Sequence, residues 1–329
     1  MQLLLRLVLA VVLLVLTAAA LWLGPFAWRV ERHPAEPARG FHADFYLYVP
    51  DLRGRGGKGE PPATILVQPN NAGRISDDPE VHRRDAWWMC FGRSRIADEL
   101  GVVLLVPTFV RPAEDWRIYT HALDQDCLTT GRPDLRRLDL QLLAMIDRAR
   151  EQLGERGIAV DERVLIQGFS ASGMFANRFT ALHPRRVRAA AIGSPGGWPI
   201  VPAERAPASD DAEAGDLRLD YPAGIADLGT LTGEPFDLEG FRAVPQLFVL
   251  GAEDDNDSLD FEDGWDPEPA AALQARFGDT PVARWDAARD LYARAGCDAR
   301  FELVPGVAHD RKALQPLSTR FFAEILERR

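Results

Sequence analysis

The chain has 329 residues, of which 47% are hydrophobic and 26% charged. This length excludes a small disulfide-stabilised protein, and the composition is that of a folded globular chain, not a disordered one. The formal net charge of −11 makes the average field of the protein repel polyanions, so we expect no nucleic-acid partner.

The first 28 residues predict an N-terminal signal or membrane anchor. The run Leu7–Leu23 is almost wholly apolar, and its length falls between that of a signal-peptide core and that of a bilayer span. The small residues Ala18 and Ala20 are typical of a cleavage site, whereas Trp22 and Trp28 are typical of the interfacial anchors of an uncleaved span. Under either interpretation the rest of the chain lies outside the cytoplasm, membrane-anchored or else secreted or periplasmic.

Residues 29–40 are rich in proline and charge and predict a tether to a single domain over residues 41–329. Phe41–Val49 alternates apolar and polar residues, which is typical of a half-exposed edge strand. Apolar strands and amphipathic helices then alternate, which predicts an α/β fold whose mostly parallel sheet is covered by helices on both faces. The expected strands are Thr64–Val67, Val102–Val106, Val164–Gln167, Val187–Ile192, Leu247–Leu250 and Phe301–Val304, and the expected helices are Val81–Leu100, one carrying Leu135 to Leu153, Ala171–Leu182, Trp285–Ala295 and Leu317–Leu326.

The alternation of strands and helices breaks over residues 199–240, which are strongly acidic and contain several Pro and Gly residues. An insertion of this length in a compact domain is either a functional lid or a disordered excursion. Because it follows a core strand, we interpret it as a lid-like insertion.

One turn has the sequence context of a nucleophile elbow. Strand Val164–Gln167 runs directly into Gly168–Gly173 and then into a helix, and such a turn requires small residues two before and two after the nucleophile. Ser170 satisfies this requirement, whereas an elbow centred on Ser172 would have the bulky Met174 at one flank. Ser170 is therefore the candidate nucleophile, and the alternative is that it only caps the following helix.

A serine hydroxyl becomes a good nucleophile when a histidine takes its proton and a carboxylate orients that histidine. Most of the six histidines precede the serine, and His183 lies too close to it, at the far end of the elbow's own helix. Only His309 remains downstream, in a loop after the last strand. The acidic loop after the preceding strand supplies the carboxylate, with Asp254 as the best candidate and Asp255 and Asp257 as rivals.

With these residues in this order, the sequence resembles the α/β-hydrolase superfamily over nearly all of the chain after the leader. The strand-G-x-x-D signature matches Gly251–Asp254, and the P-G-x-x-H signature matches Pro305–His309. The elbow departs from the common pattern because Ser172 replaces its second glycine. Gly-Phe-Ser-Ala-Ser-Gly together with an export signal is most similar to polyhydroxybutyrate depolymerases and feruloyl-esterase-like extracellular esterases.

The resemblance also implies where the oxyanion hole lies. Asn70 and Asn71 follow strand Thr64–Val67, where the family has a His-Gly loop. The resemblance thus implies that the backbone amide of Asn71, or that of Asn70, joins the amide of Ala171 in stabilising the oxyanion. Because the His-Gly pair is absent, the identity of the first donor stays open.

Four residues are candidates for lining a substrate pocket. They are Asn70, Trp116, Tyr119 and His121, which follow strands near the expected site. The alternative is that the aromatic side chains pack in the core and that His121 makes a structural hydrogen bond.

The three cysteines are too few and too scattered for a metal knuckle or a disulfide framework. Cys90 and Cys127 are the pair to test for a disulfide in an exported protein, and buried free thiols are the alternative. We expect no metal and no cofactor.

The sequence therefore predicts a serine hydrolase that cleaves a carboxylic ester, of small or polymeric substrate, through a Ser-His-Asp acyl-enzyme mechanism. A serine peptidase of the same fold is the nearest alternative, because the triad is shared. A non-catalytic, membrane-tethered binding module on a hydrolase fold is the second alternative.

Overall fold

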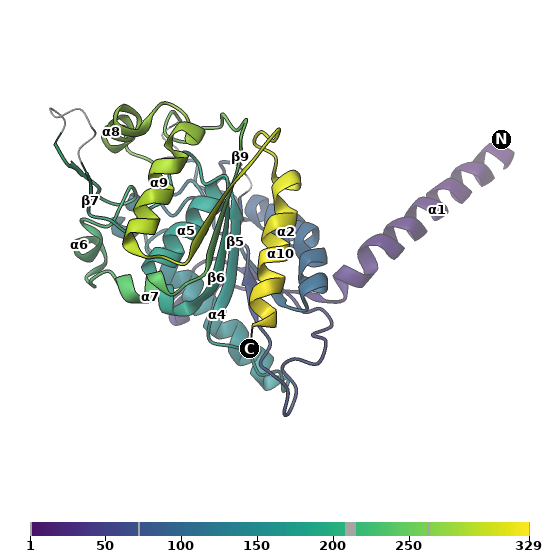
Figure 1. The fold of residues 1–329 in the computed structure, drawn as a ribbon. Coiled ribbons are helices and arrows are strands. Elements are labelled where there is room, and N and C mark those ends of the chain that lie inside the picture. The colour runs from purple at the N-terminus through teal and green to yellow at the C-terminus, as the bar shows by residue number, and fades with distance from the viewer. Residues whose placement is uncertain (1, 72, 208–214, 262–263, 329) are drawn as a thin grey trace.

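Eight strands form one central sheet in this computed structural model, which describes residues 2–71, 73–207, 215–261 and 264–328 (Figure 1). The strand order is β1-β2-β4-β3-β5-β6-β9-β10. Only β2 runs against the others, because it pairs antiparallel with both β1 and β4 whereas the remaining neighbours are parallel. The strands are β1 Val30–His33, β2 Phe45–Tyr48, β3 Ile65–Val67, β4 Val103–Pro107, β5 Val164–Phe169, β6 Val187–Gly193, β9 Gln246–Gly251 and β10 Ala299–Val304, and β7 Arg205–Ala206 pairs with β8 Leu217–Arg218 in a separate small sheet.

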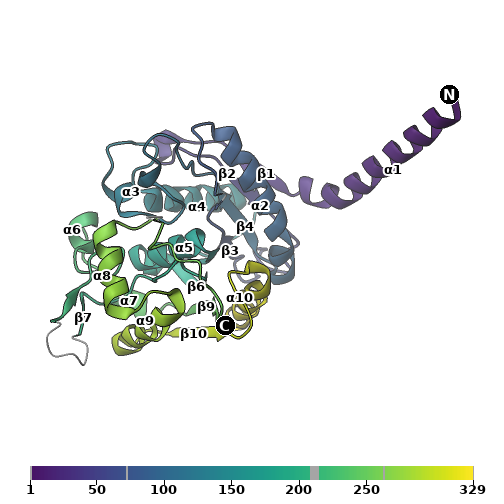
Figure 2. The same cartoon turned by 90° about the horizontal axis from the view of Figure 1, so that it is seen from above.

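Helices cover the sheet on both faces (Figures 1 and 2). One face packs against α4 Leu138–Glu155, α5 Ala171–Leu182 and α9 Pro281–Ala295, and the other against α2 Pro79–Leu100 and α10 Arg311–Glu327. The smaller helices are α3 Gln125–Thr129, α6 Leu228–Thr232, α7 Leu238–Arg242 and α8 Pro267–Phe277, with 3₁₀ turns η1 Pro37–Arg39, η2 Trp116–Ile118 and η3 Pro184–Arg186. This architecture confirms the predicted α/β class and mostly parallel sheet.

The apolar runs of the sequence become the central strands because such strands are buried on both faces. In β5, Val164 and Ile166 face one core cluster while Leu165 faces the other. Helix α2 shows how local signals set the helix ends: the Asp78 side chain accepts a hydrogen bond from the Glu80 amide at the N-cap, and Gly101 ends the helix in the left-handed conformation.

The sheet begins earlier in the chain than the sequence predicted. Val30–His33, which falls inside the expected tether, forms the edge strand β1 and pairs with β2. Because β2 then has a neighbour on each side, all four of its residues are buried, and the prediction of a half-exposed edge strand at Phe41–Val49 is wrong.

The apolar N-terminal run forms helix α1, Gln2–Ala27, which extends away from the body in both views (Figures 1 and 2). Near its end, Phe26 is buried against Tyr48, Trp87 and Phe91. Within the described part of the chain, no helix combines the length and apolar character needed to cross a membrane. The cellular location stays a prediction.

The described part of the acidic insertion packs as part of the domain. The Tyr221 hydroxyl donates to the Leu123 carbonyl, and the Ala223 carbonyl accepts from the buried Trp198 indole at 2.9 Å. Asp237, at the start of α7, pairs with Arg185. Arg185 follows the C-terminal end of α5, the end far from the elbow. The lid role of the insertion stays a prediction, and its residues 208–214 lie outside the described residues.

The cysteines are free, which corrects the disulfide proposed between Cys90 and Cys127. Both thiols are buried, Cys90 in the core cluster under α2 and Cys127 in the cluster on the opposite face of the sheet. Burial raises the pKa of each thiol, as expected for structural cysteines.

Candidate active site

Ser170 lies at the junction of β5 and α5 with an unusual backbone conformation. Its φ of 58° and ψ of −130° are strained for a residue with a side chain. The turn is held by backbone hydrogen bonds, because the Ser170 amide donates to the Gly193 carbonyl at 3.0 Å and the Ser170 carbonyl accepts from Met174 at 3.0 Å. The Ser170 side chain makes no capping hydrogen bond to α5, so the helix-cap interpretation is wrong.

The residues around Ser170 explain why the chain can turn so sharply. A Cβ on Gly168 would collide with the backbone carbonyl of Ser172, and one on Gly173 would lie 2.6 Å from the carbonyl oxygen of Gly193. The Ser172 hydroxyl donates to the Phe169 carbonyl at 2.9 Å and lies 3.0 Å from the Phe169 amide. Ser172 therefore closes the turn itself, a role that the sequence analysis did not assign to it.

Asp254 and His309 form a hydrogen-bonded pair. The His309 Nδ1 lies 3.1 and 3.0 Å from the two carboxylate oxygens of Asp254. The imidazole ring also contacts Phe169, with ring centroids 4.5 Å apart. The His309 ring is therefore held between the triad-type carboxylate and the residue that immediately precedes Ser170.

The two loops that carry this pair are bonded to each other through their backbones. The Ala252 amide donates to the Val304 carbonyl, and the Glu253 amide donates to the Val307 carbonyl, both at 2.9 Å. Gly251 makes this approach possible, because a Cβ at this position would collide with the Val307 carbonyl. The parallel pairing of β9 with β10 thus continues into the loops and brings Asp254 to His309.

The environment of Asp254 keeps its carboxylate charged. Burial alone would raise the pKa of this side chain, but hydrogen bonds from His309 and from the Asn256 amide hold the pKa below its ordinary value. A charged carboxylate can orient the His309 ring and stabilise its protonated form.

The two rival carboxylates are placed elsewhere. Asp257 forms a buried ion pair with Arg284, whose guanidinium also donates to the Gly197 carbonyl at 3.0 Å. Asp255 is exposed. Of the three sequence candidates, the structure thus brings only Asp254 to His309.

The β3 loop reaches the elbow, as the resemblance implied. The Asn71 side chain donates to the Phe169 carbonyl at 3.2 Å, and the Asn70 side chain donates to the Phe109 carbonyl at 2.8 Å. Among the described residues, the backbone amides of Asn71 and Ala171 donate to no protein acceptor. The backbone amide of Asn70 likewise donates to no acceptor in this part of the chain, so either asparagine amide can join that of Ala171.

The aromatic side chains expected to line a substrate pocket are mostly core residues. Tyr119 is buried and packs edge-on against Phe109 and Phe175. His121 is also buried, and burial lowers the pKa of its imidazole to about 3. Trp116 is half-buried beside the guanidinium of Arg111. Tyr119 and His121 therefore do not line a substrate pocket as the sequence suggested. Both side chains are buried and pack in the core instead.

A small pocket adjoins Asp254. Its walls come from the segment after β6 and from α9, and they include Pro195, Leu250 and Trp285. The sequence analysis placed Trp285 in a helix but not near the site. Helical spacing predicts that a side chain is buried, but it does not show which strand end that side chain lies beside.

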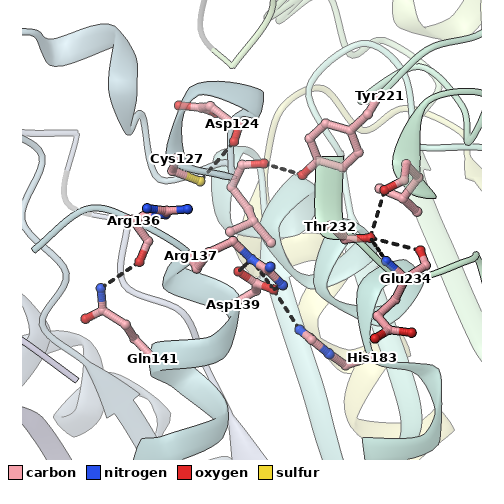
Figure 3. Close-up of polar contacts among 12 residues, drawn as sticks. Asp124, Cys127, Arg136, Arg137, Asp139, Gln141, His183, Tyr221, Thr232 and Glu234 are labelled. Carbon is pink, nitrogen blue, oxygen red and sulfur yellow. Dashed lines mark hydrogen bonds and ion pairs between the residues drawn. The ribbon is translucent and has the colours of Figure 1, made fainter. Parts of the chain in front are cut away.

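A second histidine–carboxylate pair lies elsewhere in the molecule (Figure 3). His183 Nε2 lies 2.8 Å from an Asp139 carboxylate oxygen, and Arg137 donates to the same carboxylate at 2.8 Å. Burial alone would raise the pKa of Asp139, but the hydrogen bonds from His183 and Arg137 hold it at about 2. His183 follows the end of α5 and is thus a helix length from Ser170.

The described residues contain no cluster of three or more His, Cys, Asp or Glu side chains that could hold a metal ion.

Comparison with solved structures identifies the fold. The chain is similar to poly(aspartic acid) hydrolase-1 from Sphingomonas sp. KT-1, with 20% identity, a TM-score of 0.54 and coverage of 85% of this chain and 93% of that one. It is equally similar in sequence, at 20% identity, to a poly(3-hydroxybutyrate) depolymerase from Bordetella parapertussis, with a TM-score of 0.51 and coverage of 85% of each chain. No family model and no curated protein matches the sequence. The architecture, the elbow and these structural neighbours together show that the chain has the α/β-hydrolase fold.

Proposed function

We propose that this protein is a serine hydrolase that cleaves a carboxylic ester through an acyl-enzyme. The proposal rests on Ser170, which follows β5 in a strained backbone conformation and whose side chain makes no capping hydrogen bond to α5. Ser170 lies on the same edge of the sheet as the Asp254–His309 pair. A residue keeps such a conformation only where the surrounding structure imposes it, and strain of this kind concentrates at functional sites.

In the proposed first half-reaction, His309 takes the proton from the Ser170 hydroxyl as the oxygen attacks the ester carbonyl. His309 uses Nδ1 for Asp254, so Nε2 is the nitrogen that accepts this proton. Asp254 stabilises the imidazolium that forms. His309 then protonates the leaving alcohol as the C–O bond breaks, which leaves the acyl group on Ser170.

In the second half-reaction a water molecule attacks the acyl-enzyme. His309 takes a proton from this water, and the tetrahedral intermediate collapses to release the acid and to restore the Ser170 hydroxyl. The backbone amides of Ala171 and Asn71 stabilise the negative oxygen in both intermediates, and Ala171 lies at the positive end of the α5 dipole.

The test is labelling by a fluorophosphonate probe together with hydrolysis of p-nitrophenyl acetate. Ser170→Ala removes the nucleophile, so we expect no labelling and a loss of at least about 10³-fold in kcat/KM. Ser94→Ala is the matched control, since Ser94 lies in α2 and its hydroxyl donates only to the Phe91 carbonyl. The control should label and hydrolyse like the parent.

Labelling that persists in Ser170→Ala, or a folded parent that does not label, would overturn the proposal. The second result would favour the non-catalytic binding module. A p-nitroanilide measured beside the ester distinguishes the two bond types: faster hydrolysis of the anilide would assign the protein as a peptidase of the same fold.

A further inference from the structure

A second pocket lies on the other side of the sheet, directly beneath the elbow. This pocket lies between the sheet and helices α2 and α10, and Phe169 and Gly168 form part of its wall. The charged and polar side chains that line it are Gln68, Arg93, Gln167, Arg311, Gln315 and Ser318. None of these residues has a role in the proposed hydrolytic reaction.

The pocket holds two cations and no acid. Arg93 is buried, and the burial together with the nearby Arg311 guanidinium lowers its pKa to about 10. The Arg93 side chain therefore remains protonated at neutral pH. Within the described ranges, neither guanidinium forms an ion pair with a carboxylate, and Arg93 contacts only the amide oxygen of Gln68, at 3.2 Å. A buried guanidinium without a counter-charge is costly in a protein.

The amide side chains add a further donor to the pocket. The Gln68 oxygen accepts from Arg93, and the Gln167 oxygen accepts from the Gln315 amide at 3.0 Å. The Gln167 Nε2 is buried and has no hydrogen-bond partner. The pocket thus presents N–H donors from the two guanidinium groups and the Gln167 amide, and such donors are the complement of an oxyanion.

The pocket continues outward into a groove between α2 and α10. Arg311 and Gln315 line both spaces, and the groove adds Arg95, Lys312 and Arg320 against one carboxylate, Glu99. The pocket and the groove together are therefore locally basic, on a protein whose net charge is −11. A local excess of cations that the protein does not neutralise itself is complementary to an external anion.

We propose that the pocket beneath the elbow binds an oxyanion, a phosphate or a carboxylate group, between Arg93, Arg311 and the Gln167 amide. An arginine pair of this kind recognises such groups through charge-assisted hydrogen bonds. The remainder of a larger anionic ligand would lie in the α2–α10 groove, along Lys312 and Arg320. The proposal concerns a site separate from Ser170 and does not depend on the proposed hydrolytic activity.

Thermal unfolding and isothermal titration of the full chain with inorganic phosphate and with citrate, at constant ionic strength, test this site. We expect a saturable rise in melting temperature, because a ligand that binds only the folded state stabilises it. Arg311→Gln should weaken binding of both anions at least about tenfold, since it removes one charge-assisted contact. Arg289→Gln is the matched control: it removes the same charge from an exposed side chain of α9 paired with Asp286 and should bind like the parent.

Arg93→Met supplies a second, independent readout because it removes the unpaired buried charge. Without anion this variant should melt at or above the temperature of the parent, and added phosphate should not raise it further. The two probes distinguish the source of the anion. If Lys312→Gln weakens the binding of citrate but not of phosphate, the ligand is a larger carboxylate that occupies the groove. If the variant binds both probes like the parent, the ligand is a free oxyanion. An unsaturable response to both anions, or equal binding by the parent and Arg311→Gln, would overturn the proposal.

Discussion

The molecule contains two histidine–carboxylate pairs whose surroundings differ. His309 approaches Asp254 through Nδ1, whereas His183 approaches Asp139 through Nε2. In the first pair the outer ring nitrogen, Nε2, remains for proton transfer, while in the second it is already used. Asp139 also pairs with the guanidinium of Arg137, whereas Asp254 pairs with no arginine or lysine among the described residues.

These differences separate the pair that we propose to be reactive from a structural one. The Asp139 carboxylate lies between the Arg137 guanidinium and the His183 ring in a cluster that joins α4 to the end of α5 (Figure 3), so its charge is used to hold two helices together. Asp254 lies at the end of a strand and holds a single imidazole beside the elbow. A histidine–carboxylate distance alone therefore does not distinguish a catalytic pair from a structural one.

Removing each histidine gives the largest expected contrast. In His309→Ala no base remains for the Ser170 hydroxyl, so ester hydrolysis should fall by at least about 10³-fold. In His183→Ala hydrolysis should stay within about threefold of the parent, but the free energy of unfolding should fall by about 1–3 kcal/mol because buried Asp139 loses a hydrogen-bond donor. The measurements are kcat/KM for p-nitrophenyl acetate and urea unfolding, and similar losses of activity in both variants would contradict the distinction.

The acid dependence of stability should be dominated by the structural pair. Since the folded-state pKa of Asp139 is held at about 2, below its ordinary value of 3.8, its stabilisation is fully present above pH 4 and is lost as the pH falls through about 2. The size of this contribution is about 2 kcal/mol.

Urea unfolding of the parent and of Asp139→Asn between pH 6 and pH 2 measures this contribution. The difference in unfolding free energy between the two proteins should be constant above pH 4 and should shrink by about 2 kcal/mol toward pH 2. Other carboxylates titrate in both proteins and cancel from the difference. A difference that does not change with pH would show that the Asp139 charge contributes nothing to stability.

The elbow and the central strands could be predicted because their signals are local. Helix α5 has the bounds expected from sequence, Ala171–Leu182. The elbow requires a residue without a side chain at position 168, and the glycine there is visible in the sequence. Strand β1 could not be predicted, because Val30–His33 forms a strand only through its pairing with β2. The sequence around it is charged and rich in proline, which is also typical of a tether.

The parts of the site that the sequence missed depend on contacts between distant segments. The spacing of Tyr119 and His121 after β4 places them near the site, but only packing against Phe175 of α5 decides that the Tyr119 ring points inward. The pocket between Arg93 and Arg311 joins residues more than two hundred positions apart, so no motif marks it.

The smallest expected effect belongs to the carboxylate next to the proposed triad acid. Asp254→Asn should reduce ester hydrolysis by about 10²- to 10⁴-fold, because the amide no longer stabilises the His309 imidazolium. Asp255→Asn removes the same charge one residue away, on an exposed side chain, and should change kcat/KM by less than about twofold, since exposed charges are well screened by solvent. Comparing the two variants at low and high salt separates a direct contact from a long-range electrostatic effect. A loss of activity in Asp255→Asn that disappears at high salt would be a long-range electrostatic effect. A loss of activity that persists at high salt would place Asp255 in the site and contradict the assignment of Asp254.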